Sequence, residues 1–189
     1  MAGKKLKISF GGCGFLGVYH AGVGKCVKDH APHLFDRFDT FYGASVGAIT
    51  AVCAACKSDP MVPYKWAKKT FEASRKYHFG TLHPSFDLYT RLRDFLEGFL
   101  PKNAHRLVRG KVKISLTTFP ERKNWLVTDF NTRKELINVS TALCSLVSRP
   151  PPPQLLLLSS WGVVQFACVD MRLRLYSVLK YTCTCTREN

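Results

Sequence analysis

The sequence is poor in acidic residues, and this shortage sets its charge. It has 28 Lys and Arg against 13 Asp and Glu, which gives a formal net charge of +15 over 189 residues. Such a surplus favours anionic partners, either nucleic acid or an acidic lipid headgroup layer. Hydrophobic residues make up 46% of the chain, so it can bury a core, and global disorder is excluded.

The sequence also lacks the paired ligands of a zinc site and the signatures of nucleic-acid binding. Only Cys53 and Cys56 form a C-x-x-C pair, and no second pair completes a ligand set. We therefore expect no metal or other cofactor, and we expect this pair to lie in the core. No zinc finger, RNP aromatic pair or helix-turn-helix signature is present, so we expect no nucleic-acid partner.

A secretory signal and a long apolar run are missing as well. Glycines from Gly11 to Gly17 break the apolar segment that follows Lys4 and Lys5, which argues against a signal peptide. We predict reduced cysteines in a cytoplasmic or membrane-surface protein. The uncharged stretch 40–56 is interpreted as a buried helix rather than a membrane span, and 154–169 has a membrane-seeking alternative.

The chain changes character near residue 140. Residues 1–139 alternate apolar runs with turn signals, as a folded α/β domain does. Residues 140–189 contain four consecutive prolines from Pro150 and four leucines from Leu155, without sustained periodicity. We predict one domain over 1–139 and a divergent Pro/Leu-rich tail over 140–189, hypothesised to be an alternative or misassigned C-terminus.

Strands and helices alternate along the predicted domain. Strands are expected at 6–10, 38–42, 111–119 and 125–128, and helices at 15–29, 44–56, 61–77, 87–100 and 133–146. The last two strands are expected to pair with each other across a turn. This alternation predicts an α/β fold with a mainly parallel central sheet flanked by helices.

A glycine-rich loop follows the first predicted strand. It runs from Gly11 to Gly17 and opens a helix, so its backbone N–H groups can surround a phosphate or a developing oxyanion. Gly12, Gly14 and Gly17 also satisfy G-x-G-x-x-G, and an aspartate lies about twenty residues on. A dinucleotide site and a merely structural turn therefore remain alternatives for this loop.

A second motif, Gly43-Ala44-Ser45-Val46-Gly47, lies between a predicted strand and a helix. This is the context of a nucleophile elbow, where a serine occupies a strained turn and small neighbours avoid clashes. An acyl hydrolase needs both motifs, since one supplies the nucleophile and the other holds the charge on the carbonyl oxygen. A dinucleotide enzyme has no use for Ser45, so the pair favours an acyl hydrolase.

With these residues in view, the sequence resembles the patatin-like phospholipase family over about residues 5–140. Within the family it is most similar to the branch that contains adipose triglyceride lipase and adiponutrin. The resemblance rests on Ile8–Gly17 with Tyr19 and His20, on His30–Leu34, on Gly43–Ala48, on His83–Phe86 and on Val127–Phe130.

The resemblance implies a patatin-like three-layer fold, incomplete at its C-terminal side, and a serine lipase without metal or organic cofactor. It implies hydrolysis of triacylglycerol and related glycerolipids at lipid droplets or membranes, with a possible protein co-activator. The implied nucleophile is Ser45, and the implied oxyanion hole is formed by Gly12, Cys13 and Gly14. The implied general base is an aspartate, which together with the serine makes a dyad.

The dyad aspartate is not identified in this sequence. The family places it in an Asp-Gly turn downstream of the serine, and the chain contains no Asp-Gly dipeptide. A triad of Ser45, Asp87 and His105 fits the order of an α/β-hydrolase but not the expected positions, and the six histidines are interpreted as surface or capping residues. The alternative function is a catalytically inactive lipid-droplet or membrane-binding module.

The segment 61–77 is amphipathic and strongly basic. Lys65, Lys68, Lys69 and Glu72 share one helical face, and Trp66 lies about 100° away. Such a helix is typical of an anionic membrane surface, although a solvated face over a core stripe explains the pattern equally well.

Overall fold

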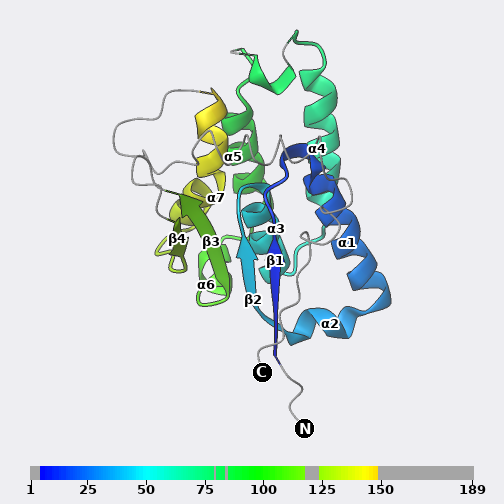
Figure 1. Cartoon of the computed structure of the whole chain (residues 1–189), viewed down its shortest axis with the longest axis vertical. Coiled ribbons are helices and arrows are strands. Elements are labelled where there is room, and N and C mark those ends of the chain that lie inside the picture. Colours follow the sequence, from blue (N-terminus) through cyan, green and yellow to red (C-terminus); the bar gives the residue numbers. More distant parts are fainter. Residues whose placement is uncertain (1–4, 79, 84, 118–123, 149–189) are drawn as a thin grey trace.

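The computed structural model describes residues 5–78, 80–83, 85–117 and 124–148 of the chain (Figure 1). Four strands form one sheet in the order β1-β2-β3-β4. The first three strands are parallel, and β4 pairs antiparallel with β3. The strands are β1 (Leu6–Phe10), β2 (Phe38–Gly43), β3 (Val112–Thr117) and β4 (Asn124–Val127). The predicted mainly parallel sheet, with its antiparallel return, is confirmed.

Seven α-helices and two 3-10 turns flank this sheet in the described residues. In Figure 1, α3 lies behind β1 and β2, with α1 and α4 to one side and α5, α6 and α7 to the other. The helices are α1 (Gly17–His30), α2 (Pro32–Arg37), α3 (Val46–Ala55), α4 (Met61–Ser74), α5 (Leu88–Phe99), α6 (Ala104–Val108) and α7 (Arg133–Ser148); the turns are η1 (Gly14–Leu16) and η2 (Gly80–Leu82).

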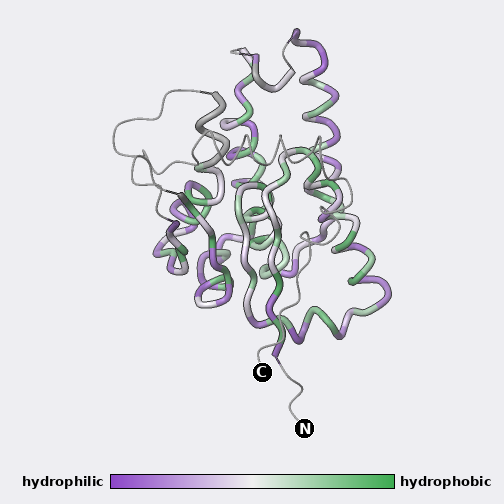
Figure 2. The backbone as a smooth tube through the Cα atoms, viewed as in Figure 1, coloured by the Kyte–Doolittle hydropathy of each residue, from purple (hydrophilic) through white to green (hydrophobic). Residues whose placement is uncertain are grey.

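The core lies between the sheet and α3. Ile8, Phe41 and Val112 are register neighbours on adjacent strands, and all three are buried on the same face. Helix α3 contacts all three parallel strands, and it is helical and buried because its side chains are small and apolar. Its buried residues are Gly47, Ala48, Ile49, Ala51, Val52 and Cys53. Figure 2 shows hydrophobic residues concentrated along this centre.

The uncharged stretch 40–56 is therefore the end of β2 followed by a buried helix, which confirms that interpretation. In the part of the chain that the structure describes, no helix combines the length and the apolar character that crossing a membrane requires. The stretch 154–169 lies outside the described residues. Cys53 is buried in the core and Cys56 packs against it, both as free thiols, as predicted.

Two short helices were not predicted. Helix α1 ends at His30, two residues before Pro32 and one residue beyond the predicted end. Pro32 starts α2, because proline at the first position of a helix loses only an N–H that has no partner there. Helix α6 has five residues, which is too short to show a periodicity.

Helix α4 has one packed side and one open side. Trp66 stacks on Phe95 of α5, with ring centroids 4.8 Å apart, so it belongs to the core. Lys65, Lys68 and Lys69 are exposed, as a solvated face over a core stripe requires. Figure 2 shows this helix alternating between hydrophilic and hydrophobic residues. The helix ends at Ser74, three residues before the predicted end.

The predicted boundary between residues 139 and 140 falls inside α7, which continues to Ser148. The boundary stays a prediction, and residues 149–189 of the predicted tail lie outside the described residues.

Candidate active site

Ser45 occupies a sharp turn between β2 and α3. Its backbone has φ 56° and ψ −130°, a left-handed conformation that residues other than glycine rarely adopt. Ser45 is the N-cap of α3, yet its side chain makes no capping hydrogen bond. The hydroxyl group is therefore left for chemistry, at the end of a helix whose N-terminus carries partial positive charge.

The two glycines of the motif explain why this turn can form. A Cβ at Gly43 would overlap the backbone of Gly47, and a Cβ at Gly47 would overlap the carbonyl oxygen of Phe10. The end of β1, the turn and the first residues of α3 are thus in backbone contact. This close approach is the steric requirement that the G-x-S-x-G spacing predicts.

The glycine-rich loop lies directly beside the serine. Phe10 and Gly43 are register partners at the ends of two neighbouring parallel strands, so the segments that follow them leave the sheet together. A Cβ at Gly12 would lie 3.1 Å from the Cβ of Ser45 and 3.3 Å from the carbonyl oxygen of Ala44. Gly14 has φ 54°, which turns the loop into η1.

The N–H groups of Gly12, Cys13 and Gly14 donate no hydrogen bond to any described residue. Unengaged donors beside a strained serine can stabilise negative charge on a substrate carbonyl oxygen. The structure thus brings the predicted nucleophile and the predicted oxyanion loop together.

A buried histidine contacts the glycine-rich loop. His20 of α1 is 3% exposed, and its Nε2 donates to the carbonyl oxygen of Gly11 at 3.1 Å. The same nitrogen lies 3.3 Å from Sγ of Cys13, and the ring packs edge-on against Phe10. Because a carbonyl only accepts, Nε2 carries the proton. The prediction that all six histidines are surface or capping residues was wrong for His20.

The shifted pKa values of His20 and Cys13 keep both side chains uncharged at neutral pH. Burial lowers the pKa of His20, and the hydrogen bond to Gly11 opposes this only in part. Burial raises the pKa of the Cys13 thiol to about 11. Cys13 is therefore a protonated thiol rather than a competing nucleophile.

No general base is in place among the described residues. No carboxylate or imidazole of this part of the chain hydrogen-bonds to the hydroxyl of Ser45. Asp129, which follows β4, is 71% exposed and lies 3.9 Å from Nε of Arg109. Asp87 caps α5 by accepting from the N–H of Thr90, which accounts for its position without a triad. In the described ranges, no three His, Cys, Asp or Glu could hold a metal ion.

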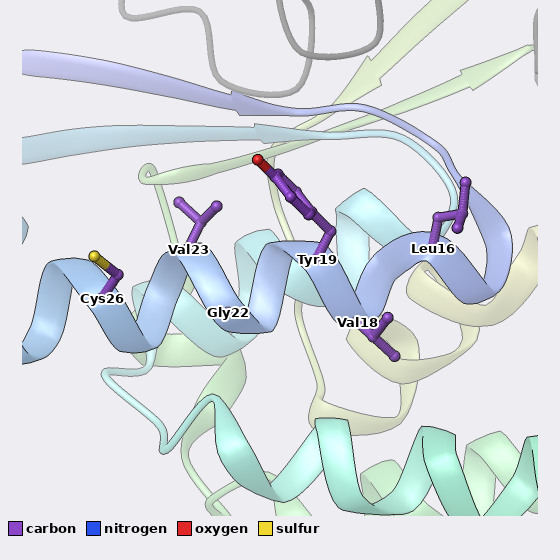
Figure 3. A pocket seen from close by; sticks show the side chains of 6 residues that line it. All are labelled: Leu16, Val18, Tyr19, Gly22, Val23 and Cys26. Atoms are coloured by element: carbon purple, nitrogen blue, oxygen red, sulfur yellow. The ribbon is translucent and has the colours of Figure 1, made fainter. Parts of the chain in front are cut away.

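An apolar hollow of about 530 Å³ runs along α1 from the end of the glycine-rich loop. Figure 3 shows Leu16, Tyr19, Val23 and Cys26 on one side of the helix, while Val18 points to the other side. The lining residues are Leu16, Val18, Tyr19, Gly22, Val23 and Cys26. This hollow was not predicted, although the i, i+3, i+7, i+10 spacing of its apolar residues is visible in the sequence.

Comparisons with known proteins identify the family of this chain. The family model for patatin-like phospholipase matches residues 8–151. The chain is 37% identical over 141 residues to mouse 1-acylglycerol-3-phosphate O-acyltransferase Pnpla3, which covers 75% of this chain and 34% of that protein. It is 39% identical over 157 residues to human patatin-like phospholipase domain-containing protein 2, and this match covers 80% of this chain and 31% of that protein.

Human patatin-like phospholipase domain-containing protein 4 is 34% identical over 144 residues, covering 74% of this chain and 55% of that protein. The chain thus spans about a third of the length of the first two relatives. No solved structure matches it significantly. The family model and these relatives confirm the resemblance, including its branch, and the chain belongs to the patatin-like phospholipase family.

Proposed function

We propose that this chain is a serine acyl hydrolase that acts on triacylglycerol and related glycerolipids. The observation that carries the proposal is the strained Ser45 at the N-terminus of α3, packed against the unengaged loop of Gly12. The cytoplasmic face of a lipid droplet or membrane is the proposed place of action. The family resemblance adds a possible protein co-activator.

The proposed reaction combines these groups with the general base that the family resemblance implies. The hydroxyl oxygen of Ser45 attacks the ester carbonyl carbon while a base, by family resemblance an aspartate, takes its proton. The carbonyl oxygen becomes negative and accepts from the N–H groups of Gly12, Cys13 and Gly14. Each such donor is typically worth roughly 3 kcal/mol of the barrier. Collapse releases the alcohol, and water then cleaves the acyl-enzyme.

The hollow along α1 supports an acyl substrate. It begins at Leu16, two residues after the oxyanion loop, and its lining is almost entirely apolar. An acyl chain that leaves the ester carbon beside Gly14 would lie against Tyr19 and Val23, which removes part of its methylene surface from water. A dinucleotide phosphate has no use for such a surface.

The proposal is tested by hydrolysis of emulsified triacylglycerol by the full chain, compared with a retinyl ester and a phospholipid. We expect release of fatty acid that Ser45→Ala abolishes and that Ser85→Ala, a change at an exposed serine, leaves intact. Equal rates for the parent and for Ser45→Ala would contradict the proposal.

A second candidate is a catalytically inactive lipid-binding module. It is favoured by one observation, namely that Ser45 has no carboxylate or histidine partner among the described residues. Without a base, a serine hydroxyl is a very weak nucleophile, and loss of a catalytic partner removes several orders of magnitude in rate. This candidate predicts binding to lipid surfaces that is unchanged in Ser45→Ala, with no fatty acid released by either protein.

A further inference from the structure

The outward face of α4 carries a surplus of positive charge. Five basic residues are exposed on α4 and just beyond it, against the single acidic Glu72. None of the five forms an ion pair with a described residue. They are Lys65, Lys68, Lys69, Arg75 and Lys76. We call them the α4 basic face.

Several other basic residues on the described surface form ion pairs. Lys25 pairs with Asp29, Lys57 with Asp36, and Arg93 with Glu97. On α4, by contrast, the spacing i, i+3, i+4 brings lysines together and adds their potentials. Because like charges held on one helix face repel one another, this arrangement is best satisfied by an anionic partner.

The α4 basic face reaches the candidate active site. Phe71 lies on its flank, is 49% exposed, and packs against Phe15 with ring centroids 5.6 Å apart. Phe15 belongs to η1, directly after the oxyanion loop, and its neighbour Leu16 is 46% exposed. A Cβ at Gly17 would overlap Val46, the residue after the nucleophile. Exposed apolar side chains thus join the α4 basic face to the end of the glycine-rich loop.

We propose that the α4 basic face, with Phe71 at its edge, is the surface by which this chain binds an anionic phospholipid layer. The lysines would adsorb to the headgroups, and Phe71 would enter the boundary between headgroups and acyl chains. Adsorption in this orientation brings the glycine-rich loop, and Ser45 beside it, toward the lipid. The inference rests on the proposed action on lipids but does not require catalysis.

The exposed apolar residues decide between a lipid layer and a nucleic acid. Both partners are polyanions, and both would lose affinity as salt rises. Only a lipid layer offers an apolar interior for a side chain such as Phe71, which is half exposed and lies among the basic residues. Nucleic-acid binding therefore becomes an outcome of the test.

The experiment is flotation of the full 189-residue chain with phosphatidylcholine vesicles, either alone or enriched in phosphatidylserine. We expect binding to the phosphatidylserine vesicles that falls with added salt. The triple variant Lys65→Gln, Lys68→Gln, Lys69→Gln should bind about a hundredfold more weakly, because each basic residue near such a surface contributes about a factor of five. Phe71→Ala should weaken binding about fivefold.

The matched control removes three positive charges elsewhere. Lys102, Arg106 and Lys111 are exposed around α6, and the triple change to glutamine at these positions should leave binding within about twofold. Thermal unfolding monitored by circular dichroism verifies that each variant is folded.

Three results would overturn the inference. One is an equal loss of binding in both triple variants, because net charge alone would then explain it. The second is an absence of preference for phosphatidylserine. The third is tighter binding to a single-stranded oligonucleotide that is insensitive to Phe71→Ala. Binding by Ser45→Ala equal to that of the parent separates this inference from the proposed hydrolysis, which can fail independently.

Discussion

Ser45 holds a backbone conformation that costs a residue with a side chain about 1–3 kcal/mol. The surrounding structure maintains it through the hydrogen bonds from Gly47 N–H to the Ala44 carbonyl and from Ala48 N–H to the Ser45 carbonyl. The strain is located at the residue that the motif assigns to catalysis, and the side chain of that residue makes no capping hydrogen bond to its own helix. This geometry is what distinguishes a nucleophile from an ordinary helix cap.

The contact of Gly47 with the end of β1 predicts a large stability effect. In Gly47→Ala, the new methyl group would overlap the backbone of both Phe10 and Gly11, which cannot move aside as a side chain can. We expect a loss of at least about 3 kcal/mol in the free energy of unfolding. Urea denaturation followed by circular dichroism measures it.

The matched control is Gly22→Ala on the exposed side of α1, where an added Cβ meets nothing within 4 Å. Alanine is the better helix former, so this variant should be more stable by up to about 1 kcal/mol. Similar destabilisation by both substitutions would show that close packing at Gly47 is not the cause.

His20 predicts how stability depends on pH. Burial lowers its pKa in the folded chain below the ordinary value near 6.5, so the unfolded chain binds the proton first as pH falls. Its contribution to stability is therefore complete above about pH 6.5 and declines below it. We expect the unfolding temperature to fall between neutral pH and about pH 5, and to fall less in His20→Gln.

His33→Gln is the matched control, since His33 is exposed. It should leave the decline as steep as in the parent. The same pH dependence in the parent and in His20→Gln would mean that another group causes the decline.

At the scale of elements, the sequence predicts the strands and long helices well, because hydrophobic periodicity is a local property. β1 is predicted at its observed bounds, and α3 and α5 within two residues. The misses have physical reasons. Helix α2 was hidden because Pro32 both ends one helix and starts the next, and α4 ends early where Ser74 turns its hydroxyl to the Phe71 carbonyl.

The start of α5 offers a test at this scale. Asp87 accepts from the N–H of Thr90 at 3.0 Å and from its hydroxyl at 2.6 Å, so it caps the helix. Asp87→Ala should cost about 1 kcal/mol of stability and should not change any acylation of Ser45. Asp94→Ala, an exposed change inside the same helix, should cost less than about 0.5 kcal/mol. Loss of acylation in folded Asp87→Ala would instead support the triad with His105.

At the scale of the whole molecule, the site is predictable as far as it depends on neighbouring strands. The two motifs follow β1 and β2, and adjacent parallel strands end at the same edge, so Gly12 and Ser45 meet. His20 was missed because its role depends on burial beneath the loop, which no motif marks. The hollow along α1 was missed because an apolar stripe on a helix ordinarily predicts core.

The general base depends on contacts between distant parts of the chain, which a local pattern does not report. Asp129 lies in the segment Val127–Phe130, one of those that carry the family resemblance, and it is exposed and next to Arg109. A base must lie within hydrogen-bond reach of the hydroxyl it activates. Whether a base activates Ser45 therefore separates a working hydrolase from a binding module. This activation can be tested without choosing a lipid.

The most direct measurement is labelling of the folded 189-residue chain by a fluorophosphonate, beside Ser45→Ala and Ser85→Ala. The probe reacts with an activated serine hydroxyl whatever the preferred ester. We predict that the parent and Ser85→Ala are labelled at Ser45 and that Ser45→Ala is not. A folded parent that takes up no label, or label that persists in Ser45→Ala, would contradict the assignment of Ser45 as the nucleophile of an acyl hydrolase.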